Sequence, residues 1–156
     1  MTRIVSVSTE LPISAELASA KAHQLEMMEF VMRPLLGFRL SEGDRARATE
    51  STGDLLPLGE EFAGRLMLFG LIPLWTHRLT IVSDTGLEIF TNESSGPVKT
   101  WNHRLTFEPI DESHCRYTDA IEIDRGLIGG ATGVFIALFF RHRQSRWRQI
   151  APLLAD

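Results

Sequence analysis

Hydrophobic and polar residues alternate along much of this chain, which is the pattern of β-strands that bury one face. The alternating stretches predict six or seven strands, at residues 4–11, 45–50, 62–69, 74–82, 87–92, 98–109 and 114–123. Helical spacing predicts a helix that Ser14 caps, that continues or breaks near His23 and that runs to Leu36. A second helix is predicted to begin near Gly126. Pro34 offers an earlier end to the first helix, because the residue before a proline avoids helical geometry. No repeat or linker divides residues 1–156, so we expect a single domain of the α+β class.

The two longest alternating stretches place ionisable residues among apolar ones, because successive side chains of a strand point to opposite sides. One face of each stretch carries a row of mostly apolar residues: Trp101, His103, Leu105 and Phe107 in the first, and Cys115, Tyr117, Asp119, Ile121 and Ile123 in the second. A three-residue connection at 111–113 would continue this apolar face from one strand to the next. It pairs Phe107 with Tyr117, Leu105 with Asp119, and His103 with Ile121. His103 and Asp119 then become diagonal neighbours, about 7 to 8 Å apart between backbones.

The pair of His103 and Asp119 has two interpretations. A carboxylate that orients a histidine is typical of general acid–base catalysis, so both residues are candidate catalytic groups. The alternative is that both side chains satisfy hydrogen bonds inside the core, which is what most buried polar groups do.

Taken in order along the chain, several short motifs resemble the SRPBCC superfamily, the START and Bet v 1-like group that includes polyketide cyclases and lipid carriers. The motifs lie between residues 62 and 147: Phe90-x-Asn92, Gly96-Pro97, Trp101-x-His103, Phe107-Glu108-Pro109, Thr118-Asp119, a bend at Gly126, and Phe139-Phe140 before an arginine cluster. The resemblance implies a helix-grip fold, in which a bent antiparallel sheet wraps a long C-terminal helix. It also implies a cavity between sheet and helix that binds or carries a small hydrophobic ligand, lipid-like or polyketide-like. The alternative function is that of a cyclase or aromatase, with His103 and Asp119 as acid and base.

Further candidates for the ligand site come from the same strands and from the last helix. The Trp-x-His pattern occurs twice, which sets an aromatic wall beside a polar group as apolar ligands with one polar atom require. The candidates are Trp75, His77, Phe90, Trp101, His103, Tyr117, Asp119, Gly129 and Gly133. The two glycines either allow close packing of the helix on the sheet or leave volume for a ligand. For the tryptophans and histidines, the alternative is ordinary core packing.

Composition limits the function classes. With 44% hydrophobic and 23% charged residues, the chain is typical of globular domains. Its formal net charge of −4 argues against a nucleic-acid partner. No metal-ligand spacing or phosphate-binding loop occurs, so we predict neither a metal nor another cofactor.

Two further expectations concern location and the chain's reactive groups. The sequence has neither a signal peptide pattern nor an apolar run long enough to span a bilayer, which predicts a cytoplasmic protein. Cys115 lies on a strand, where we expect core packing rather than reactivity. The cluster Arg141, His142, Arg143, Arg146 and Arg148 with Trp147 either complements the helix dipole or docks peripherally on anionic lipid.

Overall fold

A computed structural model describes residues 2–50, 57–124 and 129–155, with the surroundings of Gly129 excepted. Within these residues, seven strands form one antiparallel sheet in the order β1-β7-β6-β5-β4-β3-β2. The elements are β1 (Thr2–Leu11), α1 (Ala15–Ala22), α2 (Leu25–Met32), β2 (Leu36–Leu40), α3 (Glu42–Glu50), β3 (Glu61–Leu68), β4 (Ile72–Asp84), β5 (Glu88–Ser95), β6 (Val98–Asp111), β7 (His114–Asp124) and α4 (Gly129–Leu154).

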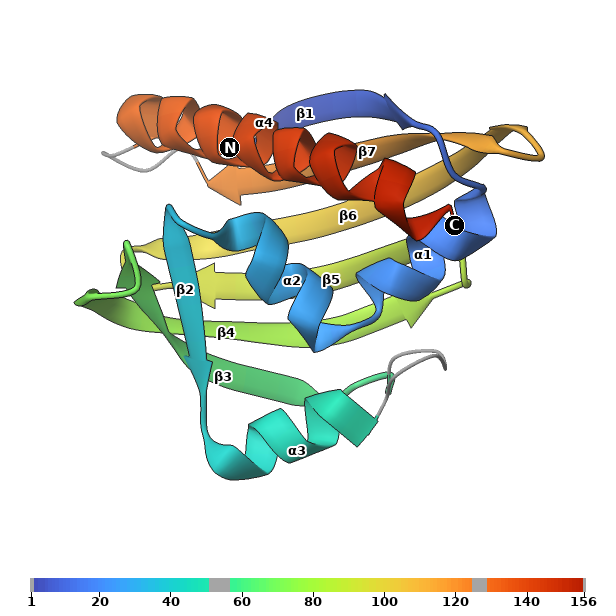
Figure 1. Cartoon of the computed structure of the whole chain (residues 1–156). Helices are drawn as coiled ribbons and strands as arrows, with labels where there is room; N and C mark the ends of the chain where they lie inside the picture. The colour runs from blue at the N-terminus through green and yellow to red at the C-terminus, as the bar shows by residue number, and fades with distance from the viewer. Residues whose placement is uncertain (1, 51–56, 125–128, 156) are drawn as a thin grey trace.

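The sheet bends around α4, and the short helices α1 and α2 lie on the same side of it (Figure 1). α4 contacts β1, β7 and α2, while α1 contacts β6 and β7. This arrangement confirms the predicted α+β helix-grip fold. No helix in the described part of the chain is long and apolar enough to cross a membrane.

The core consists of two clusters on the inner face of the sheet. One surrounds Phe107, Tyr117 and Trp147, where the first two rings stack 5.0 Å apart. The other joins Trp101 and Ile121 to side chains of α4. The alternation in β6 and β7 therefore predicted the buried face of both strands correctly.

The register of β6 and β7 is also as predicted. Phe107 pairs with Tyr117, Leu105 with Asp119, and His103 with Ile121. The predicted three-residue connection is shortened to a two-residue turn at its end. The pairing shifts by one residue between Pro109 and Asp111, so that Asp111 pairs with His114. Register is fixed here because a slip by one residue would expose the whole apolar face.

Between residues 30 and 50, the structure confirms the earlier helix end that Pro34 offered and contradicts the predicted strand. The helix does not reach Leu36: α2 ends at Met32, and Arg33 is extended, as a residue before proline prefers. The edge strand is Leu36–Leu40, which pairs with β3, whereas the predicted strand at 45–50 belongs to the helix α3. The overlooked signal was Ser41, whose hydroxyl accepts the N–H of Asp44 at 3.1 Å at the start of α3.

The other N-terminal prediction is confirmed. Ser14 caps α1 by accepting the backbone N–H of Leu17 at 3.2 Å. The helix then ends at His23, whose ring bonds to the Ser19 carbonyl at 2.6 Å and to Asp84 at 2.7 Å. These contacts fix α1 on the turn between β4 and β5.

Candidate functional site

Side chains on the inner face of the sheet leave small hollows beneath α2 and α4. The first, which we call the His77 hollow, measures about 90 Å³. The second, the Trp147 hollow, measures about 130 Å³. The two share part of their walls: Met28, Leu79, Glu93, His103 and Arg143. A third hollow of about 110 Å³ adjoins them and shares Met28 and Leu79.

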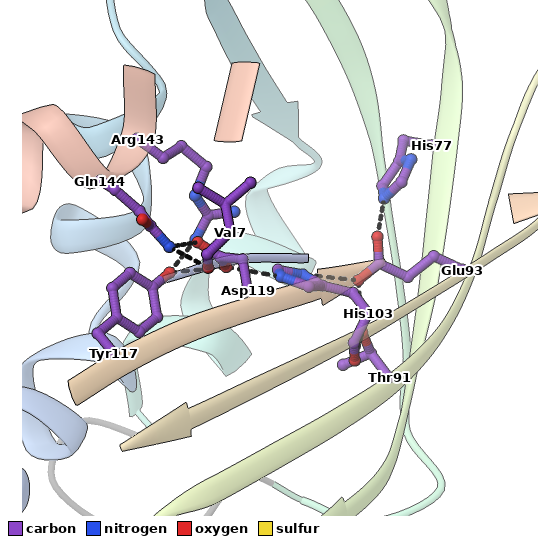
Figure 2. Close-up of polar contacts among 9 residues, drawn as sticks. All are labelled: Val7, His77, Thr91, Glu93, His103, Tyr117, Asp119, Arg143 and Gln144. Atoms are coloured by element: carbon purple, nitrogen blue, oxygen red, sulfur yellow. Dashed lines mark hydrogen bonds and ion pairs between the residues drawn. The ribbon is translucent and has the colours of Figure 1, made fainter. Parts of the chain in front are cut away.

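Four buried side chains from four strands form a continuous chain of contacts beside these hollows (Figure 2). Nε2 of His77 lies 2.8 Å from Glu93, and the other oxygen of Glu93 lies 3.7 Å from Nδ1 of His103. Nε2 of His103 lies 2.8 Å from Oδ1 of Asp119. We call His77, Glu93, His103 and Asp119 the polar chain.

Groups behind the polar chain hold its carboxylates in place. The Tyr117 hydroxyl donates to Asp119 at 2.7 Å, and Gln144 on α4 donates to the second oxygen of Asp119 at 3.4 Å. Thr91 donates to Glu93. Figure 2 shows these side chains converging from β4, β5, β6, β7 and α4. Both carboxylates therefore have several donors each, which is what a buried charge requires.

Sheet register explains why these residues meet. Glu93 pairs with Leu79 on one side and with Trp101 on the other. His77 and His103 lie two residues from those partners, so both are diagonal neighbours of Glu93 on the inner face. Asp119 stands in the same diagonal relation to His103. Each member thus occupies an inward position at which alternation would otherwise place an apolar side chain.

Burial disfavours the charged forms of Glu93, His103 and Asp119, but the groups beside them shift each pKa toward the charged form. Burial raises the pKa of Glu93, yet the nearby rings of His103 and His77 bring that pKa far below its usual range. Burial lowers the pKa of His103, while bonds to Asp119 and Glu93 raise it to a net value above its usual one. The pKa of Asp119 is likewise raised by burial and brought below its usual value by Arg143 and His103.

The result is a charge-balanced cluster. Two carboxylates, Glu93 and Asp119, face the imidazolium of His103 and the guanidinium of Arg143. Burial lowers the pKa of Arg143, but Tyr117, Asp119 and Glu93 raise it to a net value above normal. Burial and Asp119 raise the pKa of Tyr117 well above its usual value, so its hydroxyl keeps the proton that it donates. A balanced set is the form in which buried charges are tolerated.

The structure brings together most of the residues predicted for the site. His77, Trp101 and His103 line the His77 hollow. Tyr117 and Asp119 lie behind His103, fully buried, and do not border the hollow. The predicted pair of His103 and Asp119 is in direct contact.

Two predicted ligand residues, Trp75 and Phe90, lie elsewhere. Trp75 is 41% exposed and covers Gly96, with its indole N–H on Ser95 at 2.7 Å. Phe90 lies on the opposite face from Ile89 and Thr91, under the guanidinium of Arg104 at 4.4 Å. The prediction ignored that alternation in β5 buries the odd-numbered residues.

The interpretation that the glycines of α4 leave volume for a ligand is wrong for Gly133. A Cβ there would lie 3.4 Å from the Arg3 guanidinium and 3.9 Å from Ile123, so Gly133 packs against β1 and β7, away from the hollows. The surroundings of Gly129 lie outside the described residues.

The arginine cluster of α4 does not form one exposed surface, which argues against its interpretation as a lipid-docking site. Trp147 is 1% exposed, and Arg143 is buried with it because residues four apart share one face of a helix. Arg146 stacks on Phe30 at 4.1 Å, and Arg148 donates to Thr9 at 3.0 Å. The cluster therefore divides between the core and contacts with α2 and β1.

Two wall residues escaped the sequence analysis. Glu93 was missed because the predicted strand stopped at Asn92, although Ile89, Thr91 and Glu93 share the inward parity of β5. Arg143 was grouped with exposed arginines, although it lies four residues before Trp147 on α4. Continuing the two-residue period of β5 from Thr91 would have found Glu93. Applying the four-residue spacing of a helix to Trp147 would have found Arg143.

Other features of the described residues are less suited to a site. A wider depression of about 580 Å³ lies beside β2 and is lined by Arg33, Arg39 and Arg45, away from the polar chain. No group of three or more potential metal ligands occurs among the residues that the structure describes. Cys115 is fully buried, and burial raises the pKa of its thiol to about 11, which confirms its packing role.

Comparison with known proteins places these features in a family. The family described as Domain of unknown function (DUF8410) matches residues 9–150, which include the whole polar chain. The chain belongs to this family. None of the curated proteins compared with the chain matches it.

Solved structures with the same fold share little sequence with this family member. Protein CV1439 from Chromobacterium violaceum has a TM-score of 0.72 at 9% identity, covering 95% of this chain and 96% of its own. A START superfamily protein from Mycobacterium smegmatis has a TM-score of 0.70 at 12% identity, covering 97% and 98%. A point mutant of norcoclaurine synthase from Thalictrum flavum, in complex with a transition state analogue, has a TM-score of 0.66 at 7% identity, covering 100% and 98%. These likenesses confirm the START and Bet v 1-like fold that the sequence motifs indicated.

Proposed function

We propose that this protein binds a small, mostly apolar molecule in the His77 and Trp147 hollows. The observation that carries the proposal is the shared wall of the two hollows, where Glu93, His103 and Arg143 form a polar boundary between apolar surfaces. Ligand sites in proteins typically combine apolar walls with a few convergent polar groups. A core selected for stability alone would more readily fill these positions with apolar side chains.

The volumes favour a compact ligand over a long lipid chain. An apolar cavity of about 150 Å³ accepts benzene, and sites for drug-sized molecules measure about 300 to 1,000 Å³. The two hollows, at about 90 and 130 Å³, suit one ring with short substituents that extends from one hollow into the other. Met28 on α2 borders both hollows, and its flexible side chain can adapt to such a ligand.

The test begins with native mass spectrometry of freshly purified protein, followed by denaturing extraction of any bound molecule. We expect a stoichiometric passenger of low mass. Met28→Trp should fill the shared wall and remove the passenger, whereas Leu138→Trp, at a residue of α4 that is 58% exposed, should retain it. A passenger that survives Met28→Trp in a folded protein would refute binding at this position.

A second function, proton transfer in a cyclase-like or aromatase-like reaction, is favoured by one observation. His77 has a carboxylate on Nε2 at 2.8 Å, and its Nδ1 has no hydrogen-bond partner among the described residues. This is how a carboxylate orients a general base. His103, the sequence-based candidate, has a carboxylate facing each ring nitrogen and so has no free position for a substrate. In this function, His103 and Asp119 position Glu93.

Deuterium incorporation distinguishes this enzyme from a carrier. We expect the extracted passenger, incubated with protein in D₂O, to gain deuterium on carbon only if a base removes a C–H proton. His77→Gln should abolish the exchange and retain binding. An unlabelled passenger with the wild-type protein would refute the enzymatic function and leave the carrier function in place.

A further inference from the structure

The sheet has two edge strands, β1 and β2, and they differ in how they are covered. α4 packs along β1 (Figure 1), and Gln144 on α4 donates to the backbone carbonyl of Val7 in this strand. The backbone of β2, in contrast, hydrogen-bonds only to β3 within the described residues. An edge strand with unpaired N–H and C=O groups is a template on which another extended chain can pair.

The depression of about 580 Å³ follows this edge. All five residues of β2, Leu36–Leu40, border it. A hollow on one face of a strand would be lined by alternate residues, because successive side chains point to opposite sides. Leu36 and Phe38 turn their side chains into the core and are only 4% and 7% exposed, yet they border the depression together with the exposed Arg39. Five consecutive lining residues therefore place the depression along the backbone edge of the strand.

The exposed side chains at this edge are positively charged. Arg33 and Arg39 border the depression, and neither forms an ion pair with a carboxylate among the described residues. Arg39 also lies directly opposite Arg65 of β3, and both side chains are exposed. Like charges in opposite positions destabilise a sheet, so the fold itself gains nothing from this pair. A third arginine of the depression, Arg45, is paired with Glu29 at 2.6 Å. The edge of β2 thus combines unpaired backbone groups with an excess of positive charge.

We propose that β2 binds an extended acidic segment of a partner protein, which adds a strand to the sheet. The backbone of the segment pairs with the edge of β2, and its carboxylates meet Arg33, Arg39 and Arg65. Phe69, which is 57% exposed and borders the depression, provides an apolar contact for the same segment. A second copy of this chain fits less well, because pairing of β2 with itself would bring two sets of the same arginines together. This inference does not depend on the ligand proposed above.

Synthetic peptides test backbone pairing separately from charge. The probe is a fluorescein-labelled peptide that alternates glutamate with valine, and fluorescence anisotropy measures its binding. N-methylation of either the glutamates or the valines removes the N–H groups along one edge of the peptide and keeps its charge. At least one of the two methylated peptides should bind about tenfold more weakly or worse, because it cannot pair with β2. Equal binding of all three peptides would show attraction by charge alone and would overturn the proposal, as would no binding of the unmodified peptide.

Substitutions then assign binding to the edge of β2. Arg39→Glu should weaken binding of the unmodified peptide about tenfold, because a repulsion replaces an attraction. Lys99→Glu makes the same change of charge at an exposed residue of β6, which three strands separate from β2, and should leave the affinity nearly unchanged. If circular dichroism shows that Arg39→Glu is unfolded, Arg33→Glu takes its place. An unchanged affinity in the folded variant, or an equal loss in Lys99→Glu, would overturn the proposal.

Anionic vesicles test a different partner for the same arginines. Cosedimentation of the protein with vesicles of phosphatidylserine and phosphatidylcholine, without binding of the peptide, would overturn the proposal in favour of a membrane surface. Binding of the peptide without cosedimentation is the result that we expect.

Discussion

Asp119→Asn tests directly whether His103 is charged inside the folded protein. Asp119 is fully buried and accepts hydrogen bonds from His103 at 2.8 Å, Tyr117 at 2.7 Å and Gln144 at 3.4 Å. The amide keeps the shape of the side chain but leaves the positive charges of His103 and Arg143 facing only one carboxylate. Breaking a buried pair in this way costs about 3 to 5 kcal/mol.

That cost is large beside the whole stability of a domain, which is about 5 to 15 kcal/mol. At about 2 to 4 °C per kcal/mol for a chain of this size, the melting temperature should fall by about 6 to 20 °C. The cost is smaller if His103 releases its proton when its partner is lost. The pH dependence of stability distinguishes these responses.

The sign of the pH dependence follows from the pKa directions. The pKa of His103 is raised in the folded state, so its contribution is complete below the unfolded value of 6.5 and is lost as pH rises through the folded value. The pKa of Asp119 is lowered, so its contribution is present above 3.8 and is lost as pH falls through the folded value. The wild-type protein should therefore lose stability at alkaline pH, and Asp119→Asn should flatten this alkaline decline.

Urea unfolding followed by circular dichroism, from about pH 5 to about pH 9, measures both effects. Asp111→Asn is the matched control, because Asp111 is an exposed carboxylate that lies 3.0 Å from His114. Water screens such a surface pair, so little change is expected. A loss below about 1 kcal/mol for Asp119→Asn near pH 6, or an unaltered alkaline decline, would show that the polar chain is not the charged cluster described above.

Three further substitutions or reactions test other parts of the structure. Cys115, buried and with a pKa raised to about 11, should resist iodoacetamide at about pH 8 until urea unfolds the protein, and rapid labelling of the folded protein would contradict its position. Gly64→Ala would place a Cβ 2.5 Å from the Phe38 ring and 2.9 Å from a backbone oxygen, so the melting temperature should fall. Gly43→Ala, with no atom within 4 Å of the added Cβ, should raise stability by up to about 1 kcal/mol. Equal effects of the two substitutions would contradict the packing of β2 on β3. Ser14→Ala should cost about 1 kcal/mol in urea unfolding, and an unchanged midpoint would argue against the cap of α1.

The sequence alone determined the strands that carry the site. Alternation fixed which face of β6 and β7 is buried and, through it, the pairing of Leu105 with Asp119. It succeeded because the side-chain period of a strand is two and a one-residue slip would turn every apolar group to water. The contact of His103 with Asp119 could be predicted from this register alone.

The hydrophobic pattern gave a wrong prediction for α3. Residues 42–50 are mostly polar and α3 buries none of them, so the alternation of arginine and alanine at 45–48 indicated a strand that does not form. The cap at Ser41 and the ion pairs of Arg45 with Glu29 and of Arg47 with Asp44 hold this helix in place. Of these three contacts, the cap and the pair with Asp44 are local, whereas the pair with Glu29 depends on α2.

Only the tertiary structure decided how the polar chain is assembled. Glu93 connects His77 on β4 to His103 on β6, and it does so because β5 lies between those strands in the sheet. Arg143 and Gln144 reach Tyr117 and Asp119 because α4 crosses the inner face over β7. Periodicity tells which way a side chain points within its own element, but hydrogen bonds and charge balance arise between elements. Buried polar atoms with no partner among the described residues, such as Nδ1 of His77, could therefore be identified only once every other partner had been placed.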